Sequence, residues 1–291
     1  MNAFWKLSKR IFVLFFRDKA SIFFSVLSSA LVLLVFMIFL SKNAENSSAA
    51  NLLPEFGYLF QQWLMAGILY TTTFSAALNA MGQYPDDRHL KISSDLMVTP
   101  VRRSVVVSSY VFGSTMTAFC MTAIILGLTY VNILVRFGKF PRPLDILLVL
   151  LAILVSSVFH TVFAFFLATF TKTARGYNSL GLVFHSISGF LAAIYLPLGD
   201  LSAGVQNTFA FSPFVHAASL LRKAYMFSSL GTLEDGSLQA VVRGFRIFMG
   251  IDLAFGDLVF KVWQSLLFLT AISAILFLLS VRRISRSRDR L

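Results

Sequence analysis

The chain has 291 residues, of which 57% are hydrophobic and only 13% are charged. Soluble domains are usually about 45–50% apolar and about 25% charged, so this composition excludes an ordinary soluble protein and predicts an integral membrane protein. The formal net charge is +12, but the Lys and Arg residues mostly flank hydrophobic runs, so we expect no nucleic-acid partner. The single cysteine, Cys120, excludes an intrachain disulfide and a cysteine-based metal site.

Residues 1–19 have the pattern of an amphipathic helix. The apolar face carries Phe4, Leu7, Ile11, Leu14 and Phe15, and the basic face carries Lys6, Lys9, Arg10 and Arg17. An apolar stripe beside a basic face is typical of a helix that lies in the membrane interface, with its cations at anionic headgroups. The alternative is a simple basic flank of the first span, which requires no such periodicity.

Six uncharged runs are long enough to cross about 30 Å of hydrocarbon. They are residues 20–40, 56–82, 104–135, 146–171, 179–198 and 262–281. We therefore predict an all-α integral membrane protein with six transmembrane helices, forming one transmembrane domain over residues 1–291. Gly and Pro break residues 199–261 into apolar pieces that are too short to span, and we expect short re-entrant helices there, on the outer side.

The distribution of basic residues predicts the orientation. Sixteen of the 25 Lys and Arg residues fall in segments 1–19, 82–104, 172–178 and 282–291, which lie on one side if there are six spans. The positive-inside rule then places both termini in the cytoplasm, in a multi-pass protein of the cytoplasmic membrane. The loop with Arg136, Lys139 and Arg142 runs against this bias.

Residues 83–103 form the one sizeable charged loop on the predicted inner side. Pro85 followed by Asp86 and Asp87 is a helix-start signal, and Pro100 is a stop signal. This predicts a short helix from about Asp87 to Val98. Such a loop is either a solvated connector or a docking helix that receives force from another protein.

The second run is unusually polar in its C-terminal half. The polar side chains there are Thr71, Thr72, Thr73, Ser75 and Asn79. Hydroxyl side chains are routinely used for packing between membrane helices. They also suit a helix that lines a wet or amphiphilic path, and the sequence leaves both interpretations open.

Motifs for chemistry on this chain are missing. The phosphate-binding pattern G-x-x-x-x-G-K-[ST] is absent, as are His-Glu-x-x-His and paired acids within a span. His160 and His185 lie in consecutive runs, and we interpret them as neutral histidines hydrogen-bonded to neighbouring helices rather than as a metal site or a proton relay. We therefore expect no catalytic residue, no metal and no cofactor on this chain.

Four stretches, in this order, resemble the membrane subunit of type-2 ABC exporters, in the group that exports drugs, antibiotics and lipid-linked polymers. They are FFRDKASIFFSVLSSALVLLVFMIFL, DDRHLKISSDLMVTPVRR, TKTARGYNS and SGFLAAIYLPLGDLSAGVQNTFAFSPFVHAASLLRKAYM. Two positions depart from the family's usual pattern. Ser212-Pro213 stands where relatives often have Asn-Pro, and the pair Asp86 and Asp87 stands where relatives often have one acid.

The resemblance implies a six-span permease that pairs with a second copy of itself or with a related permease. It also implies a separate ABC ATP-binding subunit that carries ATP and magnesium, so this chain would not itself be an enzyme. The family's interfacial helix would lie at Asn2–Arg17, its coupling helix at Asp87–Met97, and its outer re-entrant helices at Leu201–Phe211 and Phe214–Tyr225.

The resemblance also assigns candidate residues. Those expected to contact the ATP-binding subunit are Asp86, Asp87, Arg88, Leu90, Lys91, Asp95, Leu96 and Met97. Those expected along the transport path are Thr71, Thr72, Ser75, Asn79, Asn178, Ser186 and Gly189. Hydroxyls, amides and apolar groups suit an amphiphilic substrate such as a drug, a peptide or a lipid-linked molecule. The alternatives are an ATP-independent carrier and an integral membrane enzyme.

Overall fold

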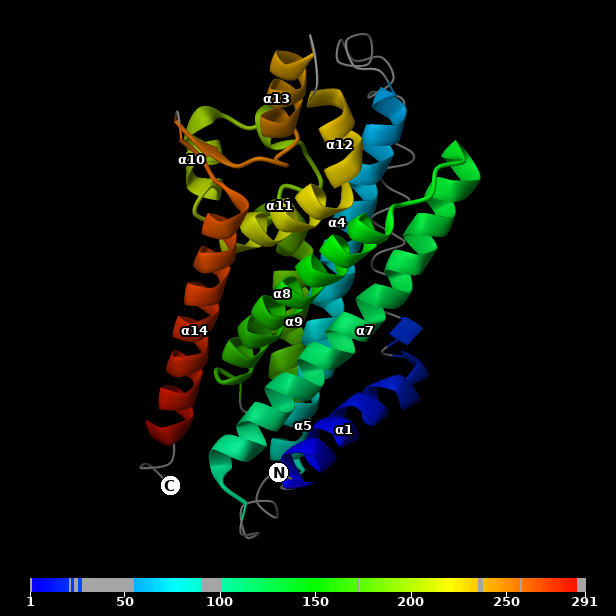
Figure 1. The fold of residues 1–291 in the computed structure, drawn as a ribbon. Coiled ribbons are helices and arrows are strands. Elements are labelled where there is room, and N and C mark those ends of the chain that lie inside the picture. The colour runs from blue at the N-terminus through cyan, green and yellow to red at the C-terminus, as the bar shows by residue number, and fades with distance from the viewer. Residues whose placement is uncertain are drawn as a thin grey trace.

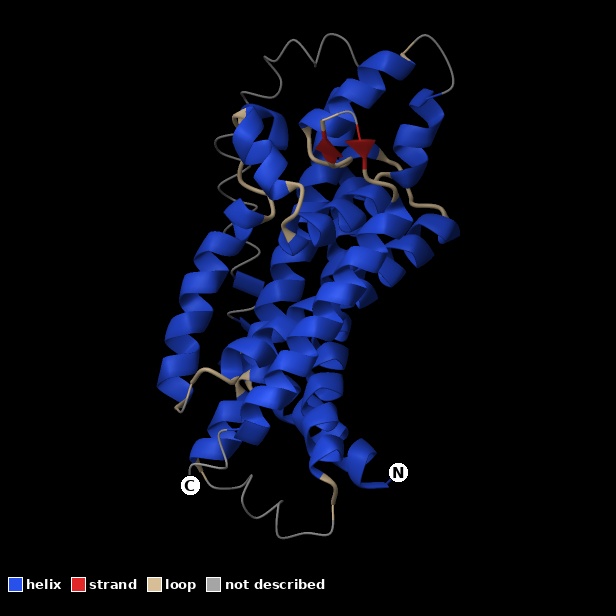
Figure 2. Ribbon diagram, turned by 90° about the vertical axis from the view of Figure 1, so that its left-hand side faces the viewer, coloured by secondary structure: helices blue, strands red, loops and turns tan. Residues whose placement is uncertain are grey.

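Helices carry most of the described chain, and the long ones run side by side in a bundle with a layer of short helices at one end (Figures 1 and 2). The computed structural model describes residues 2–20, 22–23, 26–27, 55–90, 101–171, 173–234, 238–256 and 258–286. The helices are α1 (Asn2–Arg17), α4 (Phe56–Met81), α5 (Gln83–His89), α7 (Arg103–Phe137), α8 (Pro143–Ala168), α9 (Ala174–Leu191), α10 (Ala203–Phe209), α11 (Pro213–Tyr225), α12 (Phe227–Glu234), α13 (Gln239–Phe248) and α14 (Val262–Arg286). A 3₁₀ turn spans Leu198–Asp200, and β1 (Ala254–Phe255) pairs antiparallel with β2 (Leu258–Val259).

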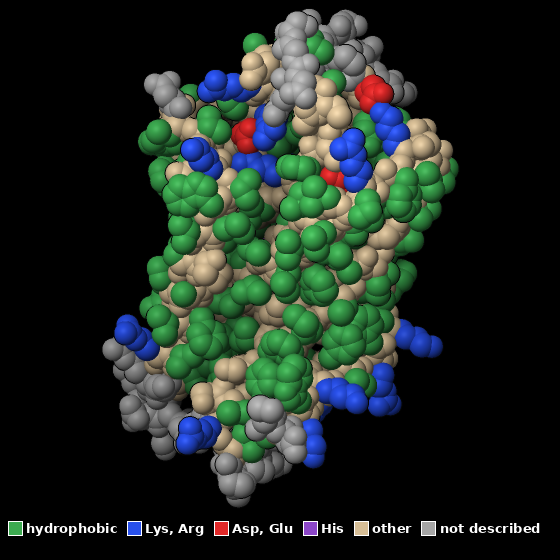
Figure 3. Space-filling view, viewed as in Figure 1, with side chains coloured by type: hydrophobic (Ala, Val, Ile, Leu, Met, Phe, Trp, Pro, Cys, Tyr) green, Lys and Arg blue, Asp and Glu red, His purple; other side chains and the backbone are tan. Residues whose placement is uncertain are grey.

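Four helical stretches among the described residues are long and apolar enough to cross a membrane: Phe56–His89, Ser104–Phe137, Pro143–Ala168 and Val262–Ile284. Figure 3 shows the corresponding surface, a broad band of apolar side chains between two ends that carry the Lys and Arg residues. This distribution is the one expected when the middle of a protein faces lipid and its ends face water. The protein is therefore a multi-pass membrane protein, while the expected span at 20–40 lies almost wholly outside the described residues.

The fifth expected span, 179–198, differs from helix α9 at both ends. The helix begins at Ala174, where the Thr173 hydroxyl accepts a hydrogen bond from the Gly176 N–H, and it ends at Leu191. Beyond it, Ala193 adopts a left-handed backbone conformation with φ 50°, which stops a right-handed helix. The stretch 192–197 is apolar but not helical, and hydrophobicity alone does not distinguish an apolar helix from an apolar irregular stretch.

Helix α4 is the centre of the bundle. It packs against α7, α8 and α11, and nearly all of its side chains are buried. A helix that is buried on every side has neighbours all round and faces little lipid. Helices α7, α8 and α11 are thus arranged around α4, whose polar half lies inside the protein.

The short helices α10, α12 and α13 lie at the end of the bundle opposite α1 and α5 (Figure 1). Helix α11 passes beneath them and contacts α4, α8 and α14. Helices α10 and α11 fall within the two segments where short re-entrant helices are expected, and their depth in a membrane stays a prediction. One end of the molecule thus carries the short helices α10, α12 and α13, and the other carries α1 and α5.

The side chain of Arg222 joins this layer to the bundle. Arg222 is only 1% exposed, and it donates to the carbonyl oxygens of Ala193 at 2.6 Å and Gly250 at 3.1 Å. Its guanidinium lies 4.8 Å from the centre of the Trp63 ring, and the Trp63 indole N–H donates to the Met249 carbonyl at 2.7 Å. One cation thus holds α4, the chain after α9 and the chain after α13 together.

This arrangement fixes the backbone at Gly250. Gly250 has φ 63°, and a Cβ there would lie 3.0 Å from an Arg222 nitrogen. A glycine supplies this left-handed conformation without strain. Burial lowers the pKa of Arg222 to about 9, so the guanidinium stays charged at neutral pH and keeps its carbonyl partners.

Replacing Arg222 with Met is expected to lower the apparent melting temperature of the purified protein. The change leaves two buried carbonyl groups without a donor, and each such group costs about 1–3 kcal/mol. Thermal unfolding in detergent measures the effect. The control is Arg243→Met on the exposed face of α13, and equal melting temperatures for the two variants would contradict this role of Arg222.

Candidate functional site

A cleft of about 790 Å³ opens between α1, α4, α5 and α9. Its walls combine three kinds of side chain. The polar ones are Ser75, Asn79, Gln83, Asn178 and His185; the acids are Asp18, Asp86 and Asp87; the apolar and aromatic ones include Leu14, Phe15, Leu27, Leu78, Tyr177 and Leu182. A volume of this size and a mixed lining fit a ligand with one apolar part and one polar part.

Three residues expected along a transport path meet in this cleft: Ser75 and Asn79 from α4, and Asn178 from α9. They are far apart in the sequence, and the packing of α9 on α4 brings them together. The Tyr177 hydroxyl donates to the Leu78 carbonyl at 2.8 Å, which fixes α9 beside the cleft. The structure therefore places part of the predicted set on one wall.

The other expected path residues lie elsewhere. The hydroxyls of Thr71 and Thr72 are buried and donate to the Ile68 carbonyl within their own helix, at 3.0 and 2.8 Å. Ser186 likewise donates to the Leu182 carbonyl, and a Cβ at Gly189 would lie 2.3 Å from the Tyr195 ring. These four residues do not line the cleft. The surroundings of Thr71 and Thr72 are those of hydroxyl side chains buried between packed helices.

Next to the cleft, Asp87 is buried and joins three helices. Arg10 of α1 donates to both of its carboxylate oxygens, at 2.6 and 2.8 Å, and the Tyr110 hydroxyl of α7 donates to the same carboxylate. The hydrogen bonds to Asp87 raise the pKa of Arg10 despite partial burial, so its guanidinium stays charged. The Asp87 carboxylate is therefore paired with Arg10 and Tyr110 of the same chain and does not lie free for contact with a partner protein.

Helix α1 approaches α7 closely at Gly113. A Cβ there would lie 2.9 Å from the Ser8 carbonyl oxygen and 3.0 Å from Ile11, so only glycine permits this distance without a shift. Ile11 and Phe15 of α1 are fully buried. The amphipathic α1 thus lies along the bundle with its apolar face against α7 and near α5.

The predicted helix from Asp87 to Val98 is wrong at its start. Helix α5 begins at Gln83 and continues from α4 almost without interruption, because the Gly82 N–H still donates to the Leu78 carbonyl. Pro85 lies in the first turn of α5, where a missing N–H is tolerated. Asp87 is thus near the end of this helix and does not cap its start.

Beyond α5, Leu90 is 65% exposed at the end of the bundle that carries α1. Arg88 and His89 precede it in the last turn of α5. The remaining residues expected to contact a partner, Lys91, Asp95, Leu96 and Met97, lie outside the described residues.

His160 lies in α8, and His185 lies in α9, where it lines the cleft. His160 is fully buried between aromatic rings, 4.9 Å from the centre of Tyr70 and 5.2 Å from that of Phe74, and neither of its nitrogens has a hydrogen-bond partner among the described residues. The expected hydrogen bond to a neighbouring helix is thus absent there. The described residues contain no cluster of three or more potential metal ligands.

The comparisons with known proteins identify the family. The sequence model of the ABC-2 family transporter protein matches residues 41–282, which is most of the chain. The chain belongs to the ABC-2 transporter family. A comparison with curated proteins found no match. As an ABC-2 permease, the chain is a transport component of an ABC transporter.

The sequence predicts neither partner of Asp87 in this permease. Arg10 belongs to the basic face of α1 that is expected at lipid headgroups, and Tyr110 lies within the uncharged run 104–135. A single basic residue on the edge of an amphipathic helix gives no signal of an internal partner. The acid pair Asp86 and Asp87 is visible in the sequence, but Arg10 and Tyr110 are separated from it by tens of residues.

A double-mutant cycle on Arg10→Met and Asp87→Asn is expected to show strong coupling. Each single change leaves the other charged group without its partner, so the double variant should lose about 1–3 kcal/mol less than the sum of the singles. Unfolding measured in detergent gives the four values. Lys9→Met, on the exposed side of the same helix, serves as the control. Additive effects of the Arg10 and Asp87 substitutions would contradict a stabilising ion pair between these two residues.

Proposed function

We propose that this permease is the membrane subunit of an ATP-driven exporter that moves an amphiphilic substrate out across the cytoplasmic membrane. A separate ATP-binding subunit binds ATP and magnesium and supplies the work. The permease pairs with a second copy of itself or with a related permease. Both termini lie in the cytoplasm, together with α5.

The observation that carries this proposal is the position of α5 between the cleft and an exposed end of the bundle. Asp86 and Gln83 of α5 line the cleft, and Leu90 lies exposed at its end. An ATP-driven permease that has no phosphate-binding motif of its own receives work through a surface that contacts the ATP-binding subunit, and a partner that binds one conformation more tightly shifts the permease toward it. Because α5 is nearly continuous with α4, a movement of α5 is transmitted to the polar wall of the cleft.

The lining of the cleft supports an amphiphilic substrate. Amides and hydroxyls at one part of the wall provide hydrogen bonds, while Leu14, Phe15 and Leu182 provide apolar contact. No excess of basic side chains is found among the described lining residues, which favours neutral or cationic polar groups over anionic ones. A drug, a peptide and a lipid-linked molecule all belong to this class.

The proposal predicts that Leu90→Asp separates the permease from its ATP-binding subunit. A carboxylate buried in an apolar contact is costly, and one such change in a central contact often removes binding. The measurement is affinity purification of the tagged protein from its native membrane, followed by an ATPase assay. We expect wild type to bring down an ATP-binding subunit with ATPase activity and Leu90→Asp to lose at least nine-tenths of both, by an order-of-magnitude estimate.

Leu258→Asp is the matched control, because Leu258 is a similarly exposed leucine (71% against 65%) in the hairpin at the opposite end. This variant should retain the partner. If wild-type protein purifies without any ATP-binding subunit, or if both variants retain it equally, the proposed coupling through α5 is wrong.

A further inference from the structure

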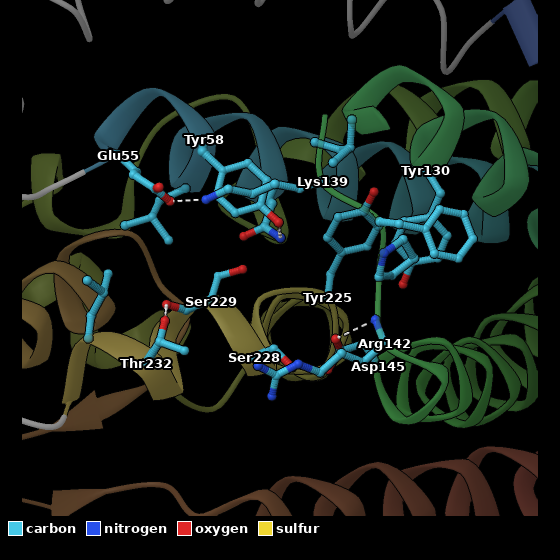
Figure 4. A pocket seen from close by; sticks show the side chains of 16 residues that line it. Glu55, Tyr58, Tyr130, Lys139, Arg142, Asp145, Tyr225, Ser228, Ser229 and Thr232 are labelled. Carbon is cyan, nitrogen blue, oxygen red and sulfur yellow. Dashed lines mark hydrogen bonds and ion pairs between the residues drawn. The ribbon is translucent and has the colours of Figure 1, made fainter. Parts of the chain in front are cut away.

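A second, smaller pocket lies at the opposite end of the bundle, and the ABC-2 assignment leaves it unexplained. Its volume is about 300 Å³, and it lies between the N-terminal part of α4, the end of α7, the start of α8 and helix α12 (Figure 4). Its lining includes Glu55, Tyr58, Gln62, Tyr130, Lys139 and Asp145.

The inner part of this pocket is rich in hydrogen-bond acceptors. Gln62 is 6% exposed; its amide nitrogen donates to the Tyr58 hydroxyl at 3.1 Å, and its carbonyl oxygen has no partner among the described residues. The buried Tyr130 hydroxyl also lacks a partner there, and it can accept or donate a hydrogen bond. An unpaired buried carbonyl oxygen costs free energy unless a donor reaches it, so this part of the pocket favours a ligand that donates hydrogen bonds.

A buried carboxylate adds negative charge to the same pocket. Asp145 is 6% exposed and accepts from the Ser228 hydroxyl at 2.6 Å and from the Arg142 backbone N–H at 3.1 Å. No Lys or Arg side chain forms an ion pair with it among the described residues, although Lys139 and Arg142 also line the pocket. Two neutral donors do not cancel a full charge, and a buried carboxylate without a cation is stabilised by a cationic ligand.

Aromatic rings complete the surroundings. Tyr130 and Tyr225 stack with their ring centres 5.0 Å apart, and both line the pocket. Tyr58 already holds a cation: the Lys139 ammonium lies 4.4 Å from the centre of its ring and pairs with the Glu55 carboxylate. Figure 4 shows this Lys139–Glu55 contact on one side of the pocket and Asp145 on the other. Tyrosine rings with nearby carboxylates are the usual recognition chemistry for ammonium groups.

From this combination we infer that the pocket is a binding site for an organic ammonium group, at the end of the protein opposite the cleft. The ligand ammonium takes the place that Asp145, Gln62 and the tyrosine rings surround. Lys139 acts as an internal competitor, because its own ammonium neutralises Glu55 and covers Tyr58. This inference concerns binding at this pocket alone and does not depend on export direction or on coupling to ATP.

The test uses three probes of equal chain length on the purified full-length protein: octylammonium, octanol and octanoate, each below its micelle concentration. Isothermal titration calorimetry measures their affinities at neutral pH. We expect octylammonium to bind at least tenfold more tightly than the other two. Equal affinities would mean simple apolar partitioning and would overturn the inference, as would preferential binding of octanoate.

Two variants assign the binding to this pocket. Asp145→Asn keeps an oxygen that can accept from Ser228 but removes the charge, and it should weaken octylammonium binding at least tenfold. Lys139→Met should tighten that binding several-fold, because it frees Glu55 and Tyr58; a misfolded protein would not gain affinity. The control is Asp200→Asn, an exposed acid in the 3₁₀ turn outside the pocket, which should leave the affinity unchanged.

If Asp145→Asn leaves the affinity unchanged, or if Lys139→Met weakens binding, the ammonium lies elsewhere and the inference fails. Neither result bears on the proposed coupling through α5, because that proposal is tested by retention of an ATP-binding subunit.

Discussion

The contact on which the account depends is the ion pair between Arg10 and Asp87. A buried carboxylate inside a helical membrane protein is costly unless a cation and hydrogen-bond donors surround it, and Arg10 and Tyr110 provide both. Because these three residues come from α1, α5 and α7, the compensation also fixes how three helices lie relative to one another. Asp87 also lines the cleft, so the same contact connects the cleft to the exposed end of α5.

The opposite end of the molecule is organised by a different kind of contact. Arg222 is buried without an ion-pair partner among the described residues, and its two terminal nitrogens donate to backbone carbonyls beside the Trp63 ring. Carbonyl groups left free where the chain leaves a helix provide the negative ends of peptide dipoles, and a guanidinium has enough donors to serve two of them. One end thus depends on a side-chain ion pair that links separate helices, while the other depends on a cation that holds irregular backbone in place.

Both arrangements join residues that are distant in the sequence, whereas the features that could be predicted depend on neighbouring residues. The membrane class, the helical stretches at 56–82, 104–135, 146–171 and 262–281, and the family follow from hydrophobic runs and local motifs, which are properties of neighbouring residues. The end of α9 could not be predicted, since the apolar stretch after Leu191 is stopped by the backbone at Ala193 rather than by composition.

For the candidate site, too, local signals could be predicted and contacts between distant residues could not. Ser75, Asn79 and Asn178, which are expected along a transport path, line the cleft, but Thr71 and Thr72 give the same local signal as Ser75 and donate to their own helix. Helical periodicity alone does not say which neighbour covers which face. The internal role of Asp87 and the outer ammonium pocket both join residues that are distant in the sequence, so no local pattern reveals them.

The central claim is that ATP bound by a partner subunit changes the cleft beside α5. The most direct measurement is the labelling rate of a cysteine placed in the cleft, Asn178→Cys in a Cys120→Ser background, by a water-soluble maleimide in membranes that contain the assembled transporter. The account predicts that trapping the complex with ATP and vanadate changes this rate several-fold, while the rate of Arg243→Cys at the opposite end stays constant. If nucleotide leaves both rates unchanged in a complex that hydrolyses ATP, the cleft does not respond to the ATP-binding subunit and the account is contradicted.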